Sequence, residues 1–126
     1  MASESHPEKH ILVVDDDADI LMALSLVLRG AGYRIVTASN GAEALAKLRG
    51  GGELPFIILT DLMMPVMNGW DFVAALRTEP ALINIPVVVM TGFRDVADHA
   101  ALQTVVCILD KPLDLEELVT TIAAFS

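Results

Sequence analysis

Three adjacent carboxylates, Asp15, Asp16 and Asp17, follow the apolar run ILVV at residues 11–14. Neighbouring carboxylates repel one another, so their ionised forms are costly unless a cation neutralises them. Ligands that are all oxygen suit a hard divalent ion, above all Mg²⁺. Asp17 is also well placed to cap a following helix. The residues alone do not show which two of the three would face an ion.

Asp61 is the strongest candidate for covalent chemistry. It follows the apolar run FIILT at 56–60 and opens the segment DLMMPVMNG, in which Pro65 and Gly69 favour a turn. A carboxylate oxygen can attack phosphorus and form an aspartyl phosphate. The alternative is a turn aspartate that caps the next helix, but Asn68 is better placed for that role. We therefore predict that Asp61 accepts a phosphoryl group.

Thr91 follows the apolar run of VVVMTG, and Lys111 stands in a comparable place in CILDKP. Lys111 precedes Pro112, and the cis form of such a bond costs only about 0.5–1 kcal/mol, so a cis link that aims the ammonium is plausible. We predict that Lys111 pairs with Asp61 before reaction and with a phosphoryl group after it. The alternative for Lys111 is an ordinary surface lysine. Thr91 could donate its hydroxyl to a phosphoryl oxygen, and the alternative for Thr91 is a residue that merely ends a strand.

Five apolar runs, separated by segments of helical spacing, should bring these side chains together. Most of the runs are continuous rather than alternating, as in parallel strands that are covered on both faces. Strand and helix in alternation predict an α/β domain with helices on both faces of a parallel sheet, and ligands bind beyond the carboxyl ends of such strands. The runs cover residues 11–14, 33–38, 56–60, 85–90 and 105–109.

Helix start signals agree with this division of the chain. Asn40 with Glu43, and Asp114 with Glu117, have the spacing of a capping residue and its reciprocal partner. The segment at about 95–103 has the poorest apolar stripe, so its helix is the least secure of the five that we expect.

Composition limits the classes of function. The chain has 126 residues, 54% of them hydrophobic, which fits one domain with a substantial core. A net charge of −9, with eight scattered Lys and Arg residues, argues against direct contact with nucleic acid or an anionic membrane. Cys107 is the only cysteine, so no internal disulfide can form, and a cytoplasmic location fits. We expect a flexible tail over 1–9 and a folded domain over 10–126.

The motifs ILVVDDD, TDLMMPVMNG, VVVMTG and DKPLDLEEL stand in the order and spacing of a known family. Over about residues 10–125 the chain resembles the receiver domains of two-component response regulators. The resemblance implies a flavodoxin-like, doubly wound five-stranded sheet in the order 2-1-3-4-5. The site it implies comprises Asp61 as phosphoacceptor, Thr91 as hydroxyl and Lys111 as ammonium, with Mg²⁺ bound by Asp15, Asp16, Asp61 and the backbone carbonyl of Met63.

The resemblance also implies partners. A histidine kinase or a phosphotransfer protein would donate the phosphoryl group, and the product would shift the face of the fourth and fifth strands that binds an unknown downstream protein or output domain. Such a domain assists only its own phosphorylation and dephosphorylation and is not an enzyme for other substrates. The chain stops at Ser126, so we expect no output domain after it. A single-domain regulator and a piece of a longer protein both stay open.

The sequence departs from the family in three places. Ile108 stands where receivers usually carry an aromatic side chain that changes rotamer on phosphorylation. The span from Thr91 to Lys111 is shorter than the family leads us to expect, which affects the 95–103 helix. Gly92 makes the backbone after Thr91 unusually permissive.

Two bulky apolar side chains near the site, Met63 and Phe93, lead us to predict slow loss of the phosphoryl group, because they would shield it from water.

Two rival functions remain. A phosphatase of the haloacid-dehalogenase type also uses a strand-end aspartate, but it needs a second acid where Met63 stands. A degenerate receiver could serve as an interaction module that is independent of phosphorylation, as Ile108 and the altered 95–103 segment suggest.

Overall fold

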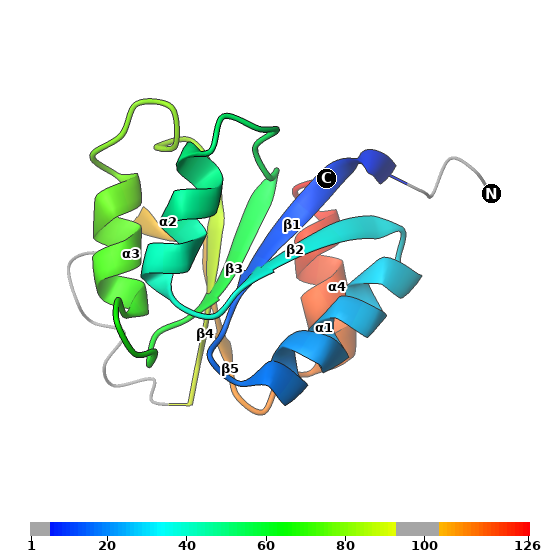
Figure 1. Cartoon of the computed structure of the whole chain (residues 1–126). Coiled ribbons are helices and arrows are strands. Elements are labelled where there is room, and N and C mark those ends of the chain that lie inside the picture. The colour runs from blue at the N-terminus through cyan, green and yellow to red at the C-terminus, as the bar shows by residue number, and fades with distance from the viewer. Residues whose placement is uncertain (1–5, 93–103) are drawn as a thin grey trace.

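The computed structural model describes residues 6–92 and 104–126, and Figure 1 shows their arrangement. The helix predicted at about 95–103 lies outside these residues. Within the described ranges, none of the helices combines the length and the apolar character needed to cross a membrane. In chain order the elements are β1 (His6–Val14), α1 (Ala18–Gly30), β2 (Tyr33–Ala38), α2 (Gly41–Arg49), β3 (Ile57–Asp61), α3 (Gly69–Leu76), β4 (Val87–Thr91), β5 (Cys107–Asp110) and α4 (Leu115–Ala123).

The five strands form one parallel sheet in the order β2-β1-β3-β4-β5, which confirms the predicted doubly wound, flavodoxin-like fold. Strand pairing continues one residue further than the apolar runs indicated. Asp61 pairs with Met90, and Thr91 pairs with Asp110, so Asp61 and Thr91 end their strands instead of following them. Because the strands are parallel, their carboxyl ends meet at one edge of the sheet.

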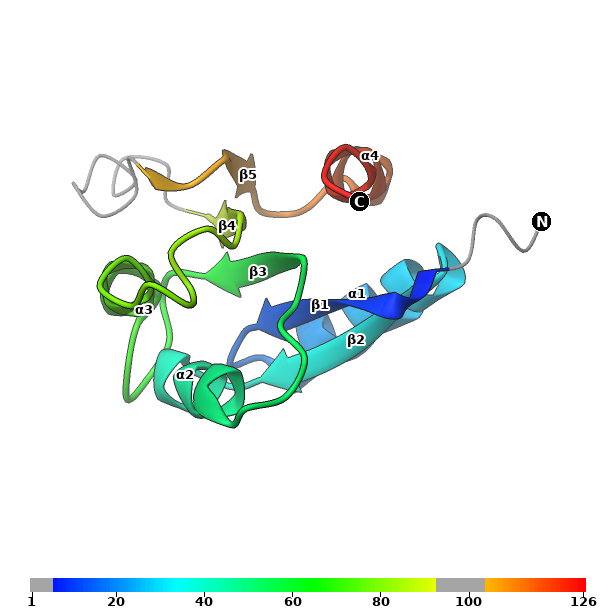
Figure 2. The same ribbon diagram turned by 90° about the horizontal axis from the view of Figure 1, so that it is seen from above.

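Side chains alternate along each strand between two hydrophobic cores, one on each face of the sheet. Helices α1 and α4 cover one face and α2 and α3 cover the other, as Figure 2 shows from above. Both faces of the sheet are therefore covered by apolar side chains and shielded from water, which explains why the apolar runs of the sequence are continuous rather than alternating. The α1/α4 core contains Ile11, Val13, Leu24, Leu28, Leu59, Met90, Leu118 and Ile122, and the α2/α3 core contains Leu12, Val14, Leu45, Ile58, Phe72, Val73, Leu76 and Val89.

Polar caps fix where each helix begins, and so fix the loops at the strand ends. Asp17 caps α1 by accepting hydrogen bonds from the backbone N–H groups of Asp19 (2.9 Å) and Ile20 (3.3 Å). Asn40 caps α2 as predicted, but Glu43 accepts a hydrogen bond from the N–H of Ser39 rather than from that of Asn40. Asn68 caps α3 and Asp114 caps α4.

Strand β1 begins at His6 and therefore overlaps the tail predicted over 1–9, of which residues 1–5 lie outside the described part. His6 pairs with Tyr33, and regular pairing resumes at His10 opposite Arg34 after an irregularity. The backbone N–H of Phe56 donates to the carbonyl of His10 at 3.1 Å, which joins this part of β1 to the chain entering β3.

We expect His10 to make the stability of the fold depend on pH. Its side chain is buried, and among the described residues Nδ1 has no hydrogen-bond partner, although it lies 3.6 Å from Glu53 Oε1. Burial, with a further contribution from the charge of Arg34, lowers the pKa of the imidazole below its ordinary value. The unfolded chain therefore binds the proton more readily than the folded protein does. The contribution of the neutral imidazole to the free energy of unfolding is complete above about pH 6.5 and is lost as the pH falls below that value.

We expect urea midpoints to fall between about pH 7.5 and pH 5, and to fall less in a His10→Leu variant, which removes the titrating group and keeps a side chain at this buried position. Urea denaturation of both proteins across this range measures the difference. Equal declines in the two proteins would contradict the assignment to His10.

Candidate functional site at the carboxyl ends of the strands

The three adjacent aspartates lie in different environments. Asp15 is fully buried at the end of β1: its N–H donates to the carbonyl of Ala38 at 3.1 Å, and its Oδ1 accepts from the N–H of Asp17 at 2.9 Å. Asp16 is exposed next to it, and Asp17 is exposed and caps α1. Burial raises the pKa of the Asp15 carboxyl, and the negative charge of Asp61 adds to this rise, while hydrogen bonds from Asp17 and Lys111 oppose it. The structure thus separates the capping aspartate from the other two.

Asp61, at the end of β3, is held through both its carboxylate and its backbone. Only 7% of the residue is exposed. Oδ1 accepts a hydrogen bond from the N–H of Leu62 at 2.7 Å, and the backbone carbonyl accepts one from the hydroxyl of Thr60 at 2.9 Å. The loop closes behind it, because the N–H of Gly69 donates to the carbonyl of Leu62 at 2.9 Å.

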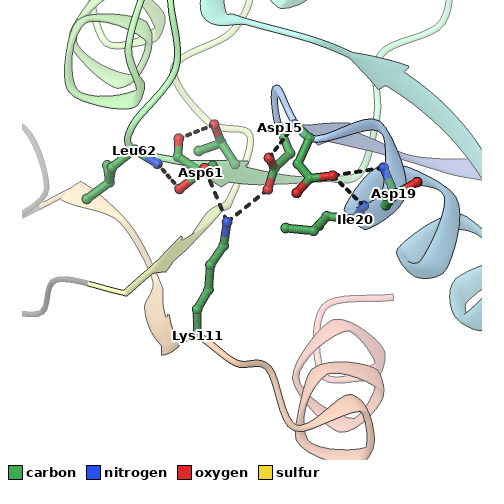
Figure 3. A network of polar contacts seen from close by, with 8 residues as sticks. Asp15, Asp19, Ile20, Asp61, Leu62 and Lys111 are labelled. Atoms are coloured by element: carbon green, nitrogen blue, oxygen red, sulfur yellow. Dashed lines mark hydrogen bonds and ion pairs between the residues drawn. The ribbon is translucent and has the colours of Figure 1, made fainter.

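Lys111 reaches from the end of β5 across to both buried carboxylates, as Figure 3 shows. Its Nζ lies 3.0 Å from Asp15 Oδ2 and 3.2 Å from Asp61 Oδ2, so the expected pair with Asp61 is present and Asp15 shares the same ammonium. The Lys111–Pro112 peptide bond is cis. Burial alone would lower the pKa of the ammonium, but the hydrogen bond to Asp15 and the charges of both carboxylates outweigh it and raise the pKa above its ordinary value.

The acidic cluster has the composition of a site for a hard cation. Asp15, Asp16 and Asp61 can each present one carboxylate oxygen, and these oxygens lie within 4.8 Å of one another. Oxygen is the ligand that Mg²⁺ prefers, and Mg²⁺ needs few protein ligands because it keeps several waters. Lys111 supplies one positive charge to three carboxylates, so the cluster retains negative charge for a divalent ion to balance. These residues therefore fit the predicted ion.

The remaining predicted residues lie around this cluster or outside the described part. Thr91 is buried at the end of β4, and its carbonyl accepts from the N–H of Lys111 at 2.9 Å. Met63 is 54% exposed, two residues beyond Asp61. Ile108 is partly buried and packs against the α2/α3 core. Phe93 falls among the residues that the structure does not describe.

Sequence reasoning did not identify Thr60 or the backbone of Leu62 as parts of the site. The only signal was a hydroxyl in the last position of an otherwise aliphatic run, FIILT, directly before Asp61. Such a residue is ordinary in a strand, and only the structure shows that its hydroxyl is buried against the carbonyl of Asp61.

The doubly wound sheet, with buried carboxylates and a lysine at its strand ends, has the arrangement expected of a CheY-like receiver. The family model described as "Response regulator receiver domain" matches residues 11–123. The chain therefore belongs to the response regulator receiver family, and it is a receiver domain of the kind found in the response regulators of two-component systems.

Curated relatives and solved structures agree with this assignment. The DNA-binding response regulator MtrA of Mycobacterium leprae is 41% identical over 91 residues, which are 71% of this chain and 38% of that protein. The transcriptional regulatory protein GlrR of Escherichia coli is 36% identical over 117 residues, which are 90% of this chain and 25% of that protein. The chain thus spans well under half the length of these curated relatives.

Among solved structures, a putative response regulator from Chloroflexus aurantiacus has a TM-score of 0.82 at 30% identity and covers 93% of this chain and 97% of its own. The chemotaxis response regulator CheY4 of Vibrio cholerae has a TM-score of 0.81 at 31% identity and covers 94% of this chain and 98% of its own.

Proposed function

We propose that this domain receives a phosphoryl group on Asp61 from a phosphohistidine of a histidine kinase or a phosphotransfer protein. The observation that carries the proposal is the position of Lys111. Its ammonium forms ion pairs with both Asp15 and Asp61, which belong to a cluster of three carboxylates. One ammonium balances only one of the three carboxylate charges of the cluster. The excess negative charge suits a cation together with an incoming phosphoryl group.

The transfer step uses the carboxylate of Asp61 as nucleophile. One of its oxygens attacks phosphorus, the new O–P bond forms as the N–P bond of the phosphohistidine breaks, and the electron pair of that bond returns to the imidazole nitrogen. The Leu62 N–H holds Oδ1 at 2.7 Å, which leaves Oδ2 on the side of Lys111. Lys111 then moves from the carboxylates to the phosphoryl oxygens and balances their charge.

Asp15, Asp16, Asp61 and the backbone carbonyl of Met63 would hold Mg²⁺. When bound, the ion supplies a positive charge that offsets the charge of the phosphoryl group during transfer.

Phosphorylation adds a dianionic group at the edge of the sheet, and two residues are placed to respond to it. Thr91 ends β4 and Lys111 follows β5, and a backbone hydrogen bond of 2.9 Å links them. If the hydroxyl and the ammonium turn toward the phosphoryl group, the ends of β4 and β5 move together. Ile108, on β5, would transmit this change by aliphatic repacking, since it lies against the α2/α3 core.

A groove beside Lys111 supports a protein as phosphoryl donor. Its volume is about 520 Å³ and it runs between α1 and the start of α4. Carboxylates stand in the first turns of both helices, at Asp19 and at Glu116 and Glu117. An apolar donor surface flanked by Lys or Arg would complement it in shape and charge. The apolar lining consists of Ile20, Ala23, Leu24, Pro112, Leu113 and Leu115.

We also propose that the domain is cytoplasmic, that its folded part begins with β1 and reaches α4, and that it is regulatory rather than an enzyme for other substrates. Its net charge of −9 argues that this stretch makes no direct contact with nucleic acid. Downstream, it would bind a protein or an output domain.

Met63 should prolong the life of the aspartyl phosphate, because its apolar side chain stands two residues from Asp61 and limits the approach of water. We expect Met63→Asn to lose the phosphoryl group about three to ten times faster, a change of roughly 0.7–1.4 kcal/mol in the barrier. Decay of the phosphorylated form after removal of the donor measures this rate. Equal decay in the parent and in Met63→Asn would contradict the shielding role.

The test of the proposed function is intact mass after incubation with a small-molecule phosphodonor and Mg²⁺. We expect a single phosphoryl adduct on the parent protein, and none on Asp61→Asn or in the presence of a chelator. An adduct that persists in Asp61→Asn would move the acceptor to another residue. No adduct under any condition, together with no Mg²⁺ binding, would favour the alternative of a phosphorylation-independent interaction module.

A further inference from the structure

We propose that Thr60 is a positioning residue that sets the orientation of the Asp61 carboxylate; this inference rests on the proposed function of Asp61 as phosphoacceptor. Thr60 lies one residue before Asp61 in β3 and is fully buried. It makes no contact with an incoming group in this role and acts only through the backbone.

The hydroxyl of Thr60 forms a hydrogen bond with the residue that follows it. Thr60 Oγ1 donates to the backbone carbonyl of Asp61 at 2.9 Å. A buried hydroxyl needs a partner, since an unsatisfied one costs about 1–3 kcal/mol. Many buried threonines meet this need through the carbonyl of an earlier residue in a helix. Here the partner is instead the carbonyl of the phosphoacceptor itself.

The peptide unit between Asp61 and Leu62 is planar. The carbonyl of Asp61 and the N–H of Leu62 belong to one rigid, trans peptide plane, so fixing one end fixes the direction of the other. The N–H of Leu62 donates to Asp61 Oδ1 at 2.7 Å. Thr60 therefore aims the hydrogen bond that orients the carboxylate. Hydrogen bonds in such a chain also strengthen one another, since a carbonyl that accepts makes its N–H a better donor.

Two neighbouring features show that the position of this peptide matters. A Cβ atom on Gly69 would lie 2.4 Å from the carbonyl oxygen of Asp61, so the loop packs closely against that oxygen. Asp61 Oδ2 lies 3.2 Å from Lys111, so the orientation of the carboxylate decides which oxygen meets the ammonium. All three oxygens of Asp61 are thus held, and Thr60 holds the one that controls the peptide plane.

The test compares Thr60→Val, which keeps the shape and removes the hydroxyl, with Thr60→Ser, which keeps the hydroxyl. With a small-molecule phosphodonor at saturating Mg²⁺, we expect the maximal rate constant of phosphorylation in Thr60→Val to fall about three- to tenfold. The donor concentration at half-maximal rate should stay within twofold. Thr60→Ser should restore the parent rate, which a mere loss of packing would not allow, because serine removes the methyl group.

A second readout does not depend on phosphorylation. The amide proton of Leu62, bonded to a carboxylate, should resonate downfield in the parent and in Thr60→Ser, and should move upfield and exchange faster in Thr60→Val. Mg²⁺ titration followed by calorimetry checks that the ion site survives in each variant.

The outcomes separate the two proposals. An unchanged Leu62 amide and an unchanged rate in Thr60→Val would overturn the positioning role, as would equal slowing in Thr60→Val and Thr60→Ser. If the parent itself takes up no phosphoryl group, the function proposed for Asp61 fails, while the Leu62 amide still decides whether Thr60 orients the carboxylate.

Discussion

Replacing Lys111 by Met should lower the free energy of unfolding by about 2–3 kcal/mol in the absence of Mg²⁺ and should increase the affinity for Mg²⁺. Removing one partner of a buried ion pair typically costs about 3–5 kcal/mol, and the side chain of Lys111 is 23% exposed, which reduces that cost. The variant leaves Asp15 and Asp61 without the ammonium that lies 3.0 and 3.2 Å away.

The increase in Mg²⁺ affinity follows from competition for the same oxygens. In the parent, a divalent ion must bind a cluster that one ammonium already partly neutralises, whereas in Lys111→Met it meets the full charge of three carboxylates. We expect the dissociation constant to fall about tenfold, or roughly 1.4 kcal/mol. The added ion should then restore most of the lost stability, because binding to the folded state alone stabilises it.

Urea denaturation with Mg²⁺ and with chelator measures both effects, and Lys111→Arg is the matched control because it keeps the positive charge. Phosphorylation should nevertheless be slower in Lys111→Met, since no ammonium remains to balance the phosphoryl oxygens. A variant with the parent's stability in chelator and the parent's response to Mg²⁺ would show that Lys111 does not neutralise the cluster.

The fold could be predicted from the sequence because each local signal agreed with the others. Continuous apolar runs, capping residues and strand-to-helix alternation all indicated one doubly wound sheet, and the sheet is as predicted. Asp17 as the cap of α1 followed from its position one residue before the helix. The ends of strands were less predictable, because polar residues such as Asp61 and Thr91 continue the ladder of hydrogen bonds without carrying an apolar signal.

Within the site, the sequence could place charged side chains at one edge of the sheet but could not show their mutual geometry. Lys111 forms ion pairs with Asp15 as well as with Asp61. These contacts depend on the spacing of β1, β3 and β5 in the sheet, which no local sequence pattern predicts. The roles of Thr60 and Gly69 depend on contacts with a backbone carbonyl, which involve no distinctive residue type. Motifs therefore indicated the polar groups that gather at the strand ends, and packing determined which neighbours hold them in place.

Gly69 shows how strict that packing is, and Gly69→Ala should lower the free energy of unfolding by about 2–3 kcal/mol, at the upper end of what overpacking usually costs. A Cβ at this position would lie 2.4 Å from the carbonyl oxygen of Asp61 and 2.8 Å from the Cα of Leu62. Both are backbone atoms that no change of rotamer can move, so the main chain of the loop must shift.

That shift should also impair the site, because Gly69 is bonded through its N–H to the carbonyl of Leu62 at 2.9 Å, and the Leu62 N–H orients Asp61. We expect phosphorylation of Gly69→Ala to slow at least tenfold. The control is Gly30→Ala, at the last position of α1, where a Cβ would meet nothing within 4 Å. Alanine there should be neutral or stabilise by up to about 1 kcal/mol, because it restricts the unfolded chain.

Urea midpoints and phosphorylation rates of the two alanine variants distinguish a specific clash from the general effect of replacing glycine. Equal stability in both variants would mean that the loop after β3 adapts freely to a side chain. It would follow that the close approach of Gly69 to Asp61 is incidental to the position of the carboxylate. A loss confined to Gly69→Ala would instead establish that the loop is built against the carbonyl of Asp61, so that the position of Asp61 depends on the absence of a side chain eight residues later.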